Sequence, residues 1–190
     1  MDHRQKIAKL QPGLQVNGKP EKRGGEYRHL ARNFGPVYDA DSTILILGSF
    51  PSARSREAAF YYGHPRNRFW PLLGRLLACE IPADTEGRKK LLLEKRIALW
   101  DTIEECDIIG SSDSSIRNVI PVDIARILNT ADIREIYCNG NTSHALFMKY
   151  LYPVCGRVPV RLPSTSPANA AFTADRLYDE WKVISEVSAE

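Results

Sequence analysis

Apolar residues occur along the chain in blocks whose spacing predicts strands and helices in turn. Short, continuous apolar runs rich in β-branched side chains occupy residues 43–47, 97–100, 135–138 and 158–162. Continuous apolarity without alternation is typical of strands that are covered on both faces. Pro159 cannot donate a ladder hydrogen bond, so the run at 158–162 is expected at the edge of the sheet.

Helical spacing of apolar residues fills the intervals between these runs. It predicts helices over residues 69–77, 85–95, 121–128, 142–151 and 173–184. Asn67 and Thr173 are the expected N-caps, and Pro121 is expected at the first position of its helix. Strands that alternate with helices favour a parallel sheet. We therefore predict an α/β fold, a three-layer αβα sandwich around a central four-stranded parallel sheet.

Residues 1–35 differ from the rest of the chain. They contain scattered glycine, proline and charge with weak periodicity, and the interpretation is a basic N-terminal arm, partly irregular, with one short helix over Tyr27–Asn33. Residues 1–40 carry eight Lys/Arg and four Asp/Glu, whereas the remainder carries 18 and 19. Such an arm either lies along phosphates or is a solvated, partly disordered segment. Residues 36–190 are expected to form one domain.

The composition is that of an ordinary globular protein, with 43% hydrophobic and 26% charged residues. No apolar run approaches the roughly 18 residues that cross a bilayer, and the first residues lack the apolar core of a signal peptide. A cytoplasmic protein is the default expectation. The four cysteines have no zinc-ligand spacing with each other or with histidine, so we expect no metal and no cofactor.

The ends of the four predicted strands carry the residues with chemical potential. These ends are Gly48–Ser52, Trp100–Asp101, Asn139–Gly140 and Leu162–Pro167. Ligands of parallel sheets bind beyond the carboxyl ends of the strands, so these segments are expected to converge on one cleft. The segment 60–70 adds aromatic rings for stacking, arginines for phosphates and one amide. These features suit a pocket for an extruded nucleobase. The alternative is a loop whose aromatic rings cap the core.

Five blocks of sequence together resemble one family. The blocks are 45–52, 61–70, 99–101, 139–140 and 162–169, and they resemble the hypoxanthine-DNA glycosylase branch of the uracil-DNA glycosylase superfamily. They follow one another in the family's order over about residues 36–185. The resemblance implies that residues 36–190 form a uracil-DNA glycosylase-like catalytic domain with a four-stranded parallel sheet. That expectation agrees with the fold predicted from periodicity.

The resemblance also implies roles for individual residues. Superfamily members normally hold a water-activating Asp or Asn where this chain has Phe50, which disfavours uracil removal. Asn67 matches the important amide of the hypoxanthine branch and is the catalytic candidate, and Ser164 stands where uracil-specific members have His. The remaining candidates are Gly48, Ser49, Pro51, Tyr62 and Asn139, with Phe50 and Ser164, for the base pocket, and Ser52, His64, Arg66, Arg68, Ser166, Pro167, Ala168 and Asn169 for contact with DNA.

The implied function is a DNA base-excision repair glycosylase, acting as a monomer on DNA. It would hydrolyse the N-glycosidic bond of a deaminated base, hypoxanthine above all, and leave an abasic site. No nucleophilic lysine is evident in the motif loops, so a monofunctional enzyme is expected. The alternatives are a mismatch-type uracil or thymine glycosylase, a catalytically weak DNA-binding member, and a nucleoside hydrolase. Other interpretations also stay open for single features: Asn67 as a cap alone, His64 as a surface residue, Asp101 as a turn, and residues 111–115 as a helix-capping loop.

Overall fold

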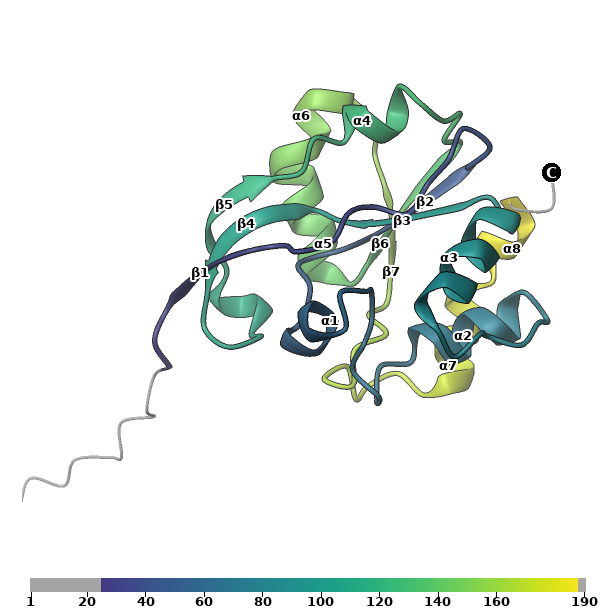
Figure 1. Cartoon of the computed structure of the whole chain (residues 1–190), viewed down its shortest axis with the longest axis horizontal. Coiled ribbons are helices and arrows are strands. Elements are labelled where there is room, and N and C mark those ends of the chain that lie inside the picture. Colours follow the sequence, from purple (N-terminus) through teal and green to yellow (C-terminus); the bar gives the residue numbers. More distant parts are fainter. Residues whose placement is uncertain (1–24, 188–190) are drawn as a thin grey trace, which may run out of the picture.

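A four-stranded parallel sheet forms the centre of the molecule in the computed structural model, which describes residues 25–187 (Figure 1). Its strands are β2 (Ile44–Gly48), β3 (Ile97–Asp101), β6 (Glu135–Asn139) and β7 (Val160–Leu162), in the spatial order β3-β2-β6-β7. The predicted sheet is therefore confirmed. β7 lies at its edge, as Pro159 indicated.

Helices cover both faces of this sheet, so the predicted three-layer α/β architecture is also confirmed. In Figure 1, α2 (Phe69–Leu76), α3 (Thr85–Glu94), α7 (Ala174–Trp181) and α8 (Val183–Val187) lie on one side. On the other side are α4 (Ala125–Leu128) and a continuous helical segment made of α5 (Asn141–Leu146), the π-helical turn η2 (Phe147–Leu151) and α6 (Tyr152–Cys155). Every residue of β2 and β3 is buried between these layers.

A second, antiparallel sheet was not predicted. It contains β1 (Arg28–Ala31), β4 (Ile103–Ile108) and β5 (Arg117–Pro121) in the order β1-β4-β5. The helix predicted over residues 27–33 is wrong, because β1 pairs there with β4. The helix predicted from Pro121 is wrong at its start, because Pro121 ends β5 opposite Ile103, on an edge strand that tolerates proline.

The boundaries of the predicted N-terminal arm need a partial revision. Residues 28–31 pair with β4, and the backbone N–H of Arg32 continues the ladder to the carbonyl of Glu104. Residues 1–24 lie outside the described part of the chain, so an arm over those residues stays a prediction. Within residues 25–187, no helix is long and apolar enough to span a membrane.

The pairing of the parallel strands brings their carboxyl ends to one edge. Gly48 pairs with Asp101, and Asn139 pairs with Leu162. Gly48 has a steric reason to lack a side chain, since a Cβ atom there would lie 2.3 Å from Asp101 Oδ1. Two further elements frame this edge, the short helix α1 (Ala53–Glu57) and the 3-10 turn η1 (Asp113–Ser115).

Candidate active site

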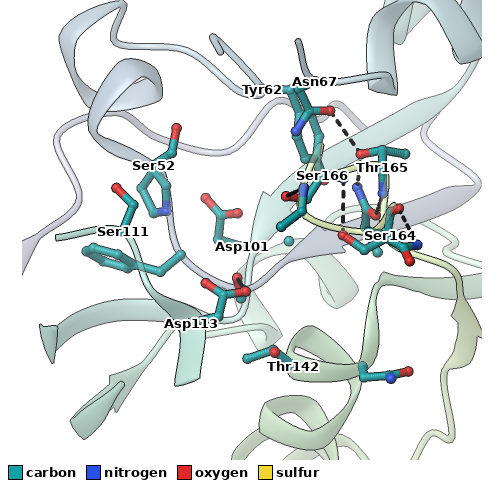
Figure 2. Close-up of a pocket in the computed structure, with 18 of the residues that line it drawn as sticks. Ser52, Tyr62, Asn67, Asp101, Ser111, Asp113, Thr142, Ser164, Thr165 and Ser166 are labelled. Carbon is teal, nitrogen blue, oxygen red and sulfur yellow. Dashed lines mark hydrogen bonds between the residues drawn. The ribbon is translucent and has the colours of Figure 1, made fainter. Parts of the chain in front are cut away.

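A cavity of about 840 Å³ opens at the carboxyl ends of the parallel strands (Figure 2). This volume lies within the range of small-molecule pockets in proteins. The catalytic candidate Asn67 lines this cavity. So do all the residues predicted for the base pocket, which are Gly48, Ser49, Phe50, Pro51, Tyr62, Asn139 and Ser164. The structure thus brings together segments that are far apart in the sequence, from Gly48 to Ser164. The chemical roles of these residues stay predictions.

Asn67 is held in one orientation by its carboxamide oxygen. Oδ1 accepts a hydrogen bond from the backbone N–H of Phe69 at 2.9 Å and another from Thr165 Oγ1 at 3.0 Å. A backbone N–H can only donate, so the oxygen must face it and the amide cannot be flipped. Asn67 therefore satisfies the first turn of α2 with its oxygen and leaves Nδ2 as a donor at the cavity wall. The N-cap of α2 is Arg68 and not Asn67 as predicted, because Asn67 lies one position earlier and its oxygen accepts from the first residue of the helix. A catalytic role for Asn67 stays a prediction.

Thr165 joins Asn67 to the end of β6. This residue is fully buried, and its Oγ1 accepts a hydrogen bond from Asn139 Nδ2 at 2.9 Å. Its backbone N–H donates to Asn139 Oδ1 at 2.9 Å. The Asn139 carboxamide thus holds the loop after β7 with both of its polar atoms, and this loop in turn holds Asn67. Contact between Asn139 and a base edge stays a prediction.

Phe50 closes one side of the cavity with an apolar ring. It is 8% exposed and packs in a small core with Ile103, Cys106 and Ile108, while the Arg56 guanidinium lies 5.6 Å from its ring centre. The ring therefore packs behind its loop and also lines the cavity. This position offers no group that could polarise water, so any acid or base at the site must come from another segment of the chain.

Three acidic residues of the described chain line the cavity, Asp101, Asp113 and Glu180, and none of them was among the predicted site residues. Asp101 ends β3 and is 4% exposed, and Figure 2 shows its carboxyl pointing into the cavity. Burial raises the pKa of Asp101 to about 7, although Arg32 opposes this effect. Asp113, in the turn η1, accepts a hydrogen bond from Ser49 Oγ at 2.9 Å. Residues 111–114 therefore form part of the cavity wall rather than capping a distant helix.

The residues predicted to contact DNA divide into two groups. Ser52, Ser166, Ala168 and Asn169 line the cavity, whereas His64, Arg66, Arg68 and Pro167 do not. Ser52 is the N-cap of α1 and accepts from the Ser55 backbone N–H. His64 Nδ1 accepts a hydrogen bond from the backbone N–H of Arg66. The Arg66 residue is exposed beside the cavity loops. The roles of both groups toward DNA stay predictions.

Arg68 binds the protein's own backbone. Its Nη2 donates to the carbonyls of Ser166 at 2.8 Å and Asn169 at 3.0 Å, Nε donates to the carbonyl of Thr165 at 3.3 Å, and Nη1 donates to that of Phe172. These bonds fix the segment between β7 and α7. The geometry gives Arg68 a positioning role in this loop, and a direct contact with DNA stays a prediction.

Three residues that line the cavity, Asp101, Asp113 and Thr165, were not among the predicted site residues. The end of β3 was expected at the cleft, but for Asp101 the sequence left open whether it orients a neighbour or forms a turn. Thr165 stood inside a quoted block, but nothing in its neighbours indicates that its hydroxyl would bridge two asparagines. Among residues 25–187, no group of three or more His, Cys, Asp or Glu side chains is arranged to hold a metal ion.

Comparison with known proteins places this chain in a family. The chain is 33% identical over 157 residues to a hypoxanthine DNA glycosylase of Methanosarcina acetivorans, a match that covers 82% of this chain and 98% of the relative. The chain belongs to the hypoxanthine-DNA glycosylase family. A hypoxanthine DNA glycosylase of Methanosarcina barkeri is 36% identical over 88 residues, which are 46% of this chain and 56% of that protein. No family model matches the chain.

A solved structure agrees with this family membership. The solution structure of a provisionally assigned uracil DNA glycosylase from Methanosarcina acetivorans superposes with a TM-score of 0.72 and 32% sequence identity. The superposition covers 84% of this chain and 99% of that protein. The hypoxanthine-DNA glycosylase family and the uracil-DNA glycosylase-like fold therefore agree with the resemblance found in the sequence.

Proposed function

We propose that this protein hydrolyses the N-glycosidic bond of hypoxanthine turned out of DNA, leaving an abasic site. The observation that carries the proposal is the free Nδ2 of Asn67 at the wall of a cavity whose first loop presents Phe50 instead of an acidic residue. The names of the two relatives support the same base. The cavity volume is sufficient for one nucleobase and its sugar.

The chemistry follows from how a glycosidic bond breaks. Positive charge develops on the sugar and negative charge on the departing base. Fixed hydrogen-bond donors that face the base stabilise that negative charge because they need no reorganisation. Asn67 Nδ2 is such a donor, since its orientation is set by two hydrogen bonds to Oδ1. With both of these bonds in place, Asn67 acts on the base or on a water by donating.

The composition of the cavity supports hydrolysis without strand cleavage. No lysine is found among the residues that line the cavity in the described chain, so an amine that attacks the sugar is not at hand. We therefore propose a monofunctional glycosylase. The alternative with a specific observation in its favour is a weakly active DNA-binding member, because Phe50 occupies the place of the water-activating residue.

The substrate can be tested with oligonucleotides that carry a single hypoxanthine, xanthine or uracil. Purified protein in excess is incubated with each, and abasic sites are detected by alkaline cleavage. We expect cleavage at hypoxanthine and little or none at uracil. Preferred cleavage at uracil would favour the mismatch-type glycosylase, and tight binding without cleavage of any substrate would favour the binding protein.

The role of Asn67 can be tested with Asn67→Ala. We expect the single-turnover rate to fall by about 10- to 1,000-fold, the range for the loss of a preorganised donor. The matched control is Asn129→Ala, which removes an exposed asparagine after α4 that does not line the cavity. An unchanged rate in Asn67→Ala, with the control also unchanged, would refute a catalytic role for Asn67.

A further inference from the structure

The Asp101 carboxyl is a buried polar group with a missing partner. The side chain is 6% exposed, and Oδ2 has no hydrogen-bond partner among the described residues. Buried polar atoms are nearly always hydrogen-bonded, so an orphaned atom at the wall of a cavity indicates a partner in the bound ligand or water. Figure 2 shows that this carboxyl lies centrally, between Ser111 on one side and Ser166 on the other.

Charged and titratable groups surround Asp101 on the protein side. Arg32 Nη2 lies 3.9 Å from Oδ2, and its guanidinium is itself buried and donates to Tyr61 at 3.0 Å. The remaining groups that face the carboxyl electrostatically come from the loop after α1 and from β4 and η1: Tyr61, Tyr62, Glu104 and Asp113. Desolvation outweighs the attraction of Arg32, and the two acidic neighbours act in the same direction as desolvation. Both protonation states of Asp101 are therefore accessible near neutral pH.

We propose that Asp101 is the general acid that protonates N7 of the departing hypoxanthine, an inference that rests on the proposed function. The C1′–N9 bond breaks, and its electron pair goes to the purine. The proton of the Asp101 carboxyl passes to N7, so that hypoxanthine leaves as a neutral molecule. Water adds to C1′ and loses a proton, which restores the Asp101 carboxyl. The sum is hydrolysis, with no other reactant.

An acid at this position explains how the site works without a water-activating residue at Phe50. An ionised carboxylate beside the base would repel the negative charge that develops on it, whereas a neutral carboxyl removes that charge by donating its proton. A general acid is most effective when its pKa lies near the working pH. Uracil has no N7, so this device would favour purines over pyrimidines.

The proposal is tested with Asp101→Asn, which keeps the size of the side chain and removes the acidic proton of the carboxyl group. We expect the single-turnover rate on hypoxanthine to fall by about 100- to 10,000-fold, the range for a general acid. The wild-type rate should fall about tenfold for each pH unit above pH 7, and the rate of the variant should not change over that range. Asp132→Asn, at an exposed carboxylate before β6, is the control and should match the wild type.

A second substrate identifies the atom that is protonated. An oligonucleotide with 7-deazahypoxanthine has carbon in place of N7 and cannot accept the proton there. The change from hypoxanthine to 7-deazahypoxanthine should lower the single-turnover rate of the wild type by a factor at least tenfold larger than for Asp101→Asn. The reason is that the variant has already lost the proton transfer. Equal losses in the two proteins would overturn the assignment to N7.

The remaining outcomes separate the two proposals. If the wild type releases hypoxanthine and Asp101→Asn is equally active, the general acid is refuted and the proposed function stands. A wild-type rate that rises with pH through 7 would show a base in place of an acid and would also overturn the inference. Release of no base by the folded wild type would refute the proposed function, and the role of Asp101 with it.

Discussion

At the scale of single residues, Asp101 should cost the protein stability. An aspartate ionises near pH 3.8 in the unfolded chain, whereas burial raises the pKa of Asp101 to about 7 in the folded protein. The contribution of Asp101 to the free energy of unfolding is thus fully present below pH 4, and it is lost as the pH rises through 7. We expect Asp101→Asn to be more stable than the wild type at pH 8, by up to about 4 kcal/mol, and equally stable at pH 4.

Urea unfolding of both proteins at pH 4, 6 and 8 measures this difference. The other ionisable groups are common to the two chains, so their contribution cancels in the comparison. Asp132→Asn should show no such dependence, because that carboxyl is exposed. Equal stability of Asp101→Asn and the wild type at pH 8 would show that the folded carboxyl ionises at an ordinary pH. A positive result would identify a residue kept in spite of its effect on stability, as is common at functional sites.

At the scale of secondary structure, the sequence predicts the central sheet well and the second sheet not at all. β2 and β3 are buried on both faces, so their apolar runs are continuous and easily detected. β1 has three exposed residues out of four, and the buried residues of β4, Ile103, Cys106 and Ile108, are not regularly spaced because the strand has register shifts. Their strand conformation depends on pairing with each other, a contact between residues about eighty positions apart that local patterns do not encode.

The candidate site was predictable to a similar degree. The strand ends indicated which segments meet, because parallel strands place their carboxyl ends at one edge. Those segments contain every predicted residue of the base pocket except Tyr62, which lies in the segment 60–70, and all of these residues line the cavity. The bridge formed by Thr165 and the burial of Asp101 depend on distances and on desolvation, which sequence patterns do not report. Arg68 shows the same limit, since its type suggests a phosphate contact while its position directs it to four backbone carbonyls.

The segment from β7 to α7 should depend on Arg68 for its conformation. Arg68→Gln removes most of the donors that hold four carbonyls in place. Hydrogen bonds from a charged group are worth about 1.5–3 kcal/mol each, but their contributions are not additive. We expect the free energy of unfolding to fall by about 2–5 kcal/mol, measured by urea denaturation. We also expect hydrogen exchange to speed up in residues 163–172.

Arg66→Gln is the matched control, since Arg66 is exposed two positions earlier in the same loop. Exposed substitutions of this kind usually change stability by less than about 0.5 kcal/mol. If the two variants are equally stable, the guanidinium of Arg68 does not hold the loop. In that case the interpretation of Arg68 as a phosphate contact would regain support, and Arg68→Gln should then weaken binding of DNA without altering hydrogen exchange.

At the scale of the whole molecule, positive charge is concentrated at the N-terminal end of the chain. Residues 1–24 hold six Lys/Arg and two Asp/Glu, although the chain as a whole carries a net charge of only +3. A cavity that admits a base does not by itself hold a long polyanion. We therefore expect the N-terminal residues to supply much of the non-specific attraction to phosphates, which would appear as a steep dependence of affinity on salt.

Replacing Arg4, Lys6 and Lys9 together with glutamine tests this expectation in the full-length chain. Each cation that lies on a phosphate of double-stranded DNA contributes about 0.9 to the slope of log affinity against log salt concentration. The slope should therefore become shallower by about 1 to 3, while single-turnover cleavage at saturating protein stays unchanged, because the cavity is intact. The control replaces the same number of cations on and just after α3, Lys89, Lys90 and Lys95, where the net charge changes equally. Equal slopes in both variants would mean that total charge, and not a basic N-terminal arm on DNA, sets the affinity.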